Sequence, residues 1–287
     1  MNLTLSERLI HSVVPLAVLD ASNRHIGSAT GFILMFFESE EYHVPVIVTN
    51  RHVFENAHAI GVTFTAANAT GEPDVGRSVN AVISADHAIM HPISTVDLAI
   101  LPIANALKTL SAAGNTPFYA YVESNLIPSE DEWENMDAVE RVIMAGYPKG
   151  MRDTVNNLPI VRSGITATPP RYDYMGSHEF LVDMPCFEGC SGSPVFILEE
   201  GGFKDKRAHR VNIGGTRIFL LGVQHAIPLS KATGTLEVLQ SDASVNIKPV
   251  MPLYLNIGYI VKSSALLDFD PILRNMLARC VPSNRQK

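Results

Sequence analysis

The chain has 287 residues, of which 46% are hydrophobic, with a mean hydropathy of +0.13 and a formal net charge of −7. This length and composition allow one large domain or two small ones with a sizeable core. The acidic balance and the lack of any Lys/Arg-rich run argue against a nucleic-acid partner, and no uninterrupted apolar stretch is long enough to cross a membrane.

The N-terminal residues predict a helix followed by a strand. The apolar run 9–19 is interrupted by His11 and Pro15 and ends without a small-residue cleavage site, so we do not expect a signal peptide. We expect a helix at about 6–13 and then the first strand. The three cysteines are an odd number, which argues against a disulfide framework and favours a cytoplasmic location.

The first half of the chain shows closely spaced strand signals, which fit one antiparallel β-barrel. They lie at residues 31–37, 44–49, 61–65, 79–85 and 98–103. The polar, acidic segment 123–140 follows, and we interpret it as the connection between two halves or as an exposed loop. The predicted halves are therefore residues 1–122 and residues 123–287.

The second half shows a similar series of strand signals. They lie at residues 138–146, 159–166, 179–184, 194–198, 218–225 and 256–261. Two polar stretches, 199–216 and 230–248, look like insertions, and each is a candidate loop over a cleft. The spaced apolar positions of residues 263–277 predict a terminal helix that is broken near Pro271.

Three motifs carry the residue types of nucleophilic catalysis. One apolar strand ends at His52, another opens at Asp97, and Ser191 lies in the run Gly-Cys-Ser-Gly-Ser-Pro ahead of a third strand. Gly189 can adopt backbone angles closed to other residues, which lets the turn direct N–H groups toward the Ser191 hydroxyl. A nucleophile beside convergent N–H donors is what acyl transfer requires. Taken alone, the segment could also be an ordinary Gly/Ser/Pro turn.

With His52, Asp97 and Ser191 in this order, the chain resembles the trypsin-like serine proteases of the chymotrypsin fold. It looks most like the bacterial intracellular members, including those related to HtrA. The resemblance spans about residues 25–265 and includes the segments 29–32, 145–148, 158–164 and 221–223. It implies an all-β protein of two six-stranded antiparallel β-barrels with short N-terminal and C-terminal helices.

The resemblance also implies the roles of the site residues. Ser191 would be the nucleophile of a serine endopeptidase, His52 its general base and Asp97 the group that orients His52. The N–H groups of Gly189 and Ser191 would form the oxyanion hole. Two neighbours, Cys190 and Ser193, are rival nucleophiles, but the Gly-x-nucleophile-Gly frame selects Ser191. We interpret Cys190, like Cys186, as a small packed residue.

Substrate preference depends on the residues around the predicted pocket. Pro185 stands six positions before Ser191, where relatives that cleave after Lys or Arg carry an aspartate. An uncharged side chain before the scissile bond is therefore expected. Glu188 is expected at the rim, and Gln224 and His225 on the strand that borders the pocket, where either could bond a Gln-like or Glu-like side chain.

Two other functions compete with the endopeptidase. One is a binding or adaptor module of the same fold whose triad is held inactive, because the insertions could block a cleft. The other is a zinc hydrolase that uses His87 and His91, although Pro92 argues against the helix that their spacing needs. We expect a protein or peptide substrate, no cofactor and no metal, and neither a nucleic-acid nor a membrane partner. The oligomeric state stays open.

Overall fold

The computed structural model describes residues 3–37, 42–208, 210–233 and 250–280. Its first half is a nine-stranded sheet in which seven strands follow the order β5-β4-β1-β2-β3-β7-β6. These seven are β1 (Val13–Leu19), β2 (His25–Phe36), β3 (Val44–Thr49), β4 (Ala59–Ala67), β5 (Pro73–Ser84), β6 (Ile89–Met90) and β7 (Ala99–Pro102). Two short strands complete the sheet: β8 (Pro117–Phe118) pairs with β4, and β9 (Val122–Glu123) runs parallel to β2.

The chain itself joins the two ends of this sheet. Strands β5 and β6 lie at opposite ends of the strand order, yet they are consecutive in sequence and are linked through the 3-10 turn η2 (Ala85–His87). In the middle, β3 pairs with both β2 and β7. Val46, Ile47 and Val48 of β3 are fully buried, which explains why this strand is apolar without alternation.

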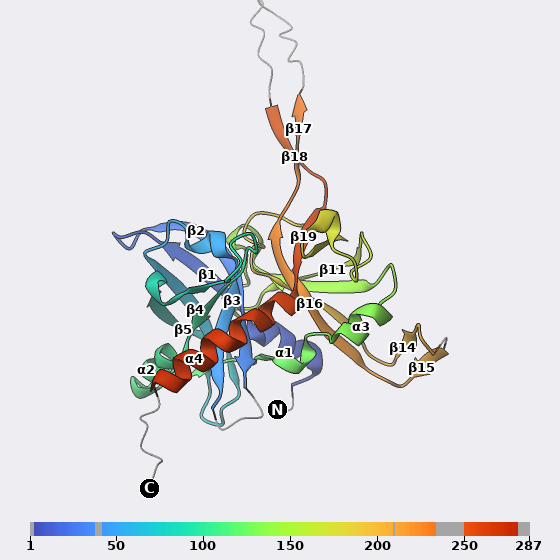
Figure 1. The fold of residues 1–287 in the computed structure, drawn as a ribbon. Coiled ribbons are helices and arrows are strands. Elements are labelled where there is room, and N and C mark those ends of the chain that lie inside the picture. Colours follow the sequence, from blue (N-terminus) through green and yellow to red (C-terminus); the bar gives the residue numbers. More distant parts are fainter. Residues whose placement is uncertain (1–2, 38–41, 209, 234–249, 281–287) are drawn as a thin grey trace, which may run out of the picture.

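The second half contains a closed barrel with the order β10-β11-β12-β19-β16-β13, in which all pairs are antiparallel. Its strands are β10 (Arg141–Gly146), β11 (Ile160–Thr166), β12 (Glu179–Asp183), β13 (Pro194–Glu199), β16 (Arg217–Ala226) and β19 (Ile257–Lys262). Two separate hairpins leave the barrel, β14 (Gly202–Asp205) with β15 (Arg210–Ile213) and β17 (Leu229–Thr233) with β18 (Val250–Tyr254). Figure 1 shows the β17–β18 hairpin projecting away from the body.

Helices lie at the ends of the chain and in the connections. They are α1 (Leu5–Ser12), α2 (Ala104–Ala112), α3 (Glu130–Asn135) and α4 (Asp270–Cys280), and the 3-10 helix η6 (Ser263–Phe269) leads into α4. Within the described residues, no helix is both long enough and apolar enough to pass through a bilayer.

The predicted fold class, an all-β double barrel, is confirmed, although the first half has nine strands and not six. The predicted N-terminal helix and the break in the C-terminal helix are also present. Helix α2 was not predicted. The acidic connection contains helix α3, which begins with a capping box between Ser129 and Glu132. Its Trp133 side chain is buried. The insertion 199–216 is the β14–β15 hairpin, whereas most of 230–248 lies outside the described residues.

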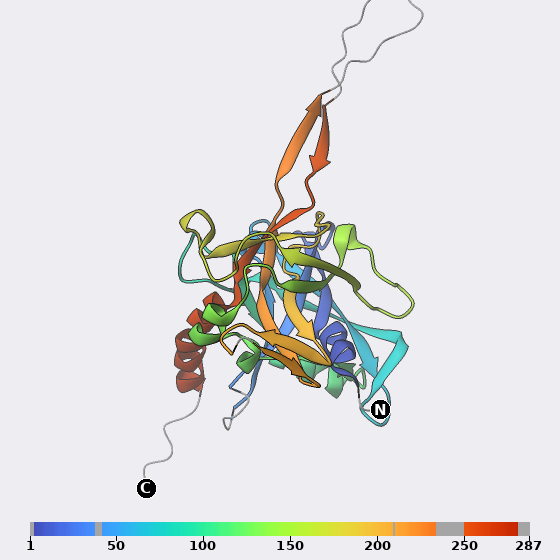
Figure 2. The same ribbon diagram turned by 90° about the vertical axis from the view of Figure 1, so that its right-hand side faces the viewer.

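A shared hydrophobic core joins the two halves. It contains Phe32 and Leu34 of β2, Phe196 of β13, Leu220 of β16 and Phe269 of η6, all buried. The C-terminal helix α4 also lies against the first half (Figures 1 and 2). There the Arg274 guanidinium sits 4.3 Å above the Phe37 ring. The placement of residues from one half relative to the other is therefore fixed by packing, while the boundary after residue 122 stays a prediction.

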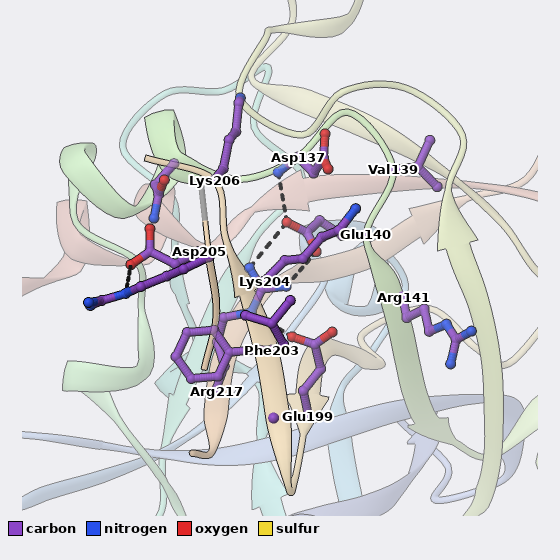
Figure 3. A pocket seen from close by; sticks show the side chains of 14 residues that line it. Asp137, Val139, Glu140, Arg141, Glu199, Phe203, Lys204, Asp205, Lys206 and Arg217 are labelled. Atoms are coloured by element: carbon purple, nitrogen blue, oxygen red, sulfur yellow. Dashed lines mark hydrogen bonds and ion pairs between the residues drawn. The ribbon is translucent and has the colours of Figure 1, made fainter. Parts of the chain in front are cut away.

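An ion network supports the edge of the barrel (Figure 3). Arg217 of β16 contacts Glu140 at 2.5 Å and Glu199 of β13 at 2.7 Å. The Glu140 side chain is only 6% exposed. This network walls a cavity of about 750 Å³ between the barrel and the β14–β15 hairpin. The network therefore ties the segment before β10 to two barrel strands.

We expect Arg217→Ala to lower the free energy of unfolding by about 3–5 kcal/mol, because it leaves the buried Glu140 carboxylate without its cation. Arg210→Ala is the matched control, since Arg210 is exposed and lies 3.8 Å from Asp205. It should cost at most about 1 kcal/mol. Chemical denaturation measures both, and equal losses in the two variants would contradict the role given to the network.

Candidate active site

Strand pairing brings His52 and Asp97 together. Thr49, the last residue of β3, pairs with Ala99 of β7, so the residues just beyond this pair meet at one end of the sheet. The 3-10 turn η1 (Arg51–Phe54) then places the His52 ring beside Asp97. His52 Nδ1 lies 2.6 Å from Asp97 Oδ2, and the His52 backbone N–H donates to Asp97 Oδ1 at 3.0 Å.

Asp97 is ionised in this arrangement. Its burial alone would raise the pKa of the carboxyl group, but hydrogen bonds from His225 and His52 outweigh burial and lower the pKa. A carboxylate can only accept, so His52 Nδ1 is the donor in the short contact. His52 Nε2 is then the basic nitrogen of the neutral ring, as a general base requires.

The loop that carries Ser191 is held by β2. The Thr30 N–H donates to the Ser191 carbonyl, and Thr30 Oγ1 donates to the Gly189 carbonyl, both at 2.9 Å. Gly192 has φ +87°, and a Cβ there would lie 2.0 Å from the Thr30 carbonyl oxygen. Only glycine can therefore follow Ser191 at this point of contact.

Ser191 and His52 line the same cavity, which has a volume of about 220 Å³. Its other walls include Gly27, Ser28 and Ala29 of β2. Across the part of the chain that the structure describes, no hydrogen bond joins the Ser191 and His52 side chains. In proteins without substrate such bonds are often long and tighten only when substrate binds.

The rival nucleophiles are inaccessible. Cys190 and Ser193 are fully buried, whereas Ser191 is partly exposed. Burial also raises the pKa of the Cys190 thiol and raises the pKa of Cys186 to about 12. A protonated, buried thiol is a poor nucleophile. The geometry therefore favours Ser191 within this loop.

Two backbone N–H groups remain available beside Ser191. The Glu188 carbonyl accepts from the Lys149 N–H at 2.6 Å, and in a trans peptide the N–H points opposite to the carbonyl. The Gly189 N–H therefore points away from Lys149. Within the described residues, neither the Gly189 N–H nor the Ser191 N–H has a protein acceptor, so both can bind a ligand oxygen.

His225, whose predicted contact with substrate stays a prediction, lies against Asp97. Its Nδ1 is 3.5 Å from Asp97 Oδ2, and its Nε2 is 3.2 Å from Glu179 Oε1. Burial lowers the pKa of His225, but the contacts with Asp97 and Glu179 outweigh burial and raise the pKa to about 9. At neutral pH, Asp97 therefore lies between the His52 ring and a protonated His225.

The other predicted pocket residues occupy different environments. Gln224 is 1% exposed, and its amide Nε2 donates to the Ala226 carbonyl while its Oε1 is buried without a hydrogen bond. Pro185 and Glu188 are exposed on the loop that precedes Ser191. Their contact with substrate stays a prediction.

Two residues of the site escaped the sequence analysis. Thr30 lies in the segment 29–32, which carried part of the family resemblance but no assigned role. Glu179 opens β12 without any motif, so no local signal marks it. Of the two histidines considered for the rejected zinc site, His91 is buried, and its Nε2 lies 3.1 Å from the Ala265 carbonyl oxygen. No group of three residues suited to a metal occurs within the described ranges.

The cavity beside Arg217 is larger than the one beside Ser191, but it is a less suitable reaction site. It lacks all three predicted catalytic residues. Its main cation, Arg217, is already matched by Glu140 and Glu199 (Figure 3). The smaller cavity is lined by Ser191 and by His52, whose Nδ1 lies 2.6 Å from the partly buried Asp97 carboxylate, and we therefore take it as the candidate active site.

Comparison with known proteins gives one sequence match. The family model described as "Trypsin-like peptidase domain" matches residues 29–203. No curated protein matches the chain in sequence.

Several solved structures share a similar backbone fold. The MamO protease domain from Magnetospirillum magneticum matches at 13% sequence identity with a TM-score of 0.44, and the match covers 92% of this chain and 97% of that chain. HL collagenase matches at 15% sequence identity with a TM-score of 0.46, and the match covers 93% of this chain and 94% of that chain. An inactivated protease paralogue of the scabies mite matches at 12% sequence identity with a TM-score of 0.42, and the match covers 93% of this chain and 95% of that chain.

The raised pKa of His225 predicts a pH-dependent stability. Because its pKa is about 9 in the folded state against an ordinary value of 6.5, the contribution is complete below about pH 6.5 and is lost as the pH rises through 9. Relative to His225→Asn, the wild type should lose on the order of 3 kcal/mol of unfolding free energy across this window. Denaturation at pH 6 and pH 9.5 measures the loss.

The exposed His87 provides the control for this experiment. His87→Asn should keep the full pH dependence of the wild type, because its side chain lies at the surface. Parallel stability curves for the wild type and His225→Asn would show that His225 carries no extra proton in the folded protein.

Proposed function

Because this chain belongs to the trypsin-like peptidase domain family, we propose that it is a serine endopeptidase that hydrolyses peptide bonds through an acyl-enzyme on Ser191. The observation that carries the proposal is the 2.6 Å contact of His52 with Asp97 at a cavity shared with Ser191. All three residues lie within the matched segment 29–203.

The proposed reaction uses each group in turn. Ser191 Oγ attacks the scissile carbonyl carbon while its proton passes to His52 Nε2. The oxyanion that forms is bound by the N–H groups of Gly189 and Ser191. His52 then gives the proton to the leaving amine, and the acyl-enzyme remains. Water, deprotonated by His52, hydrolyses the ester and releases the acid, and the proton returns to Ser191.

The wider setting is part of the same proposal. The first half, residues 1–122, would supply His52 and Asp97, and the second half, residues 123–287, would supply Ser191. The reaction needs no cofactor or metal, since the nucleophile is activated by an imidazole. We propose a cytoplasmic location, because the number of cysteines is odd and argues against a disulfide framework. We also propose that the substrate is a protein or peptide.

A binding or adaptor module is the second candidate. It is favoured by one observation, that within the described residues Ser191 and His52 share a cavity without a hydrogen bond between their side chains. In such a protein the triad residues would persist without completing a reaction. Covalent labelling of the serine distinguishes the two functions, because only an assembled site activates its hydroxyl.

We expect a fluorophosphonate probe to label the wild type and not Ser191→Ala, and we expect this variant to lose peptide hydrolysis by at least about 10³-fold. Ser193→Ala is the matched control, because its hydroxyl is fully buried two residues away. It should keep both labelling and hydrolysis. Folded wild type that neither labels nor hydrolyses peptides would favour the binding module.

Thr30→Val tests how the nucleophile loop is positioned. The substitution nearly keeps the side-chain shape but removes the hydroxyl that donates to the Gly189 carbonyl and accepts from the Tyr147 N–H. Because the oxyanion donors lie in this loop, kcat should fall by about 10-fold to 100-fold with a smaller change in KM.

Thr63→Val removes a hydroxyl that bonds Asn80 on β5, away from the loop, and it should leave kcat unchanged. If Thr30→Val raises KM and leaves kcat unchanged, the positioning role is contradicted.

A further inference from the structure

Arg162 places a positive charge beside the loop that carries Ser191. It lies on β11 opposite Met144 of β10, whose side chain is buried in the barrel. The Arg162 guanidinium carbon is 4.9 Å from the centre of the Phe187 ring, four residues before Ser191. The cation therefore links strand β11 of the barrel to the loop that leads to Ser191.

The charge of Arg162 is felt along the loop. It lowers the pKa of the Cys186 and Cys190 thiols, although burial has the larger, opposite effect on both. Cys186 follows Pro185, the predicted base of the substrate pocket, and Cys190 precedes Ser191. The Arg162 charge therefore acts on residues at both ends of the Cys186–Cys190 segment, whose middle carries the Phe187 ring that the guanidinium contacts.

Arg162 has no anionic partner in the described part of the chain. Its Nε is buried without a hydrogen bond, and no carboxylate lies within ion-pair distance of the guanidinium. The partly buried cations elsewhere in the barrel differ: Arg217 contacts two carboxylates, and Lys262 contacts Asp173 at 2.7 Å. Glu188, the acidic residue of the same loop, is exposed and forms no ion pair with Arg162.

A partly buried guanidinium without an anion is costly for a protein. Its planar group of N–H donors matches a carboxylate, which it can bind through two parallel hydrogen bonds. A ligand that supplies a carboxylate at this position would satisfy the buried Nε and balance the charge. The Lys149 ammonium, 5.9 Å from the same Phe187 ring, adds to the positive potential there.

We propose that Arg162 is the specificity-determining residue of the pocket and that the protein cleaves after Asp or Glu. The acidic side chain of the substrate would enter beside the Cys186–Cys190 loop and pair with the guanidinium. This departs from the uncharged side chain expected from Pro185, because the charge comes from β11 and not from the pocket base. The proposal rests on the endopeptidase function proposed above.

The first test needs only the wild-type protein. Two fluorogenic peptides that differ by Glu against Gln before the scissile bond have nearly the same shape, so their ratio isolates the charge. We expect kcat/KM to be at least about tenfold higher for the Glu peptide, and a similar ratio for an Asp and Asn pair. Equal or lower values for the acidic peptides, in enzyme that hydrolyses the neutral ones, would overturn the proposal.

Variants then assign the preference to Arg162. Arg162→Gln should lower the Glu-to-Gln ratio of kcat/KM to about one, and Arg162→Glu should shift the preference to Lys. Arg141→Gln is the matched control, since Arg141 is exposed on the neighbouring strand β10, and it should keep the wild-type ratio. Retention of the Glu preference in folded Arg162→Gln would show that another group provides it.

The two proposals fail in different ways. A protein that hydrolyses no peptide and takes no fluorophosphonate label overturns the endopeptidase function and, with it, the preference. A protein that is labelled and cleaves neutral peptides best keeps the function and overturns the preference alone. If Arg162→Gln does not fold, the wild-type ratio for the matched peptides still decides.

Discussion

The hydrogen bonds between Thr30 and the Ser191 loop are the contacts on which the geometry of the site depends. Thr30 belongs to β2 in the first half, and it binds the carbonyls of Gly189 and Ser191 in the second. Its own carbonyl accepts from Thr49 Oγ1, at the end of the strand that leads to His52. One residue therefore sets the position of the proposed nucleophile relative to the proposed base, and the close approach of Gly192 leaves no room for a shift.

Asp97 works in an unusual electrostatic setting, because it contacts two imidazoles. A protonated His225 alone would cancel the negative charge that an imidazolium at His52 needs for its stabilisation. Glu179, 3.2 Å from the far side of His225, restores that charge. The group formed by Asp97, His225 and Glu179 then carries a net charge of about −1, the same as a single aspartate. The second histidine can thus hold Asp97 in place without removing the electrostatic role that we propose for it.

Local patterns predicted what depends on local sequence. Strand β3 was found at its observed bounds because both of its faces are apolar, and His52 and Asp97 stood out because each adjoins a buried strand. His225 and Glu179 are 46 positions apart in the sequence, and they meet because β12 and β16 both pair with β19. Hydrophobic periodicity predicts single strands and does not predict which strands pair. Arg162 lies in the segment 158–164, which carried part of the family resemblance but no assigned role. Its significance comes from a property that the sequence does not show, the lack of an anionic partner among the described residues.

The position of β19 has a consequence for how the protein is made. This strand lies between β12 and β16, so the barrel around Ser191 stays open until residue 262 has been synthesised. Ribosomes need on the order of 10 s to add the roughly 80 residues that separate β12 from the end of β19. During that interval the edge of β12 that β19 will cover is unpaired, and once residue 226 has been added the edge of β16 is unpaired as well. Such edges invite pairing with other chains. The nascent polypeptide is therefore exposed to wrong strand pairing until β19 closes the barrel that holds the proposed nucleophile.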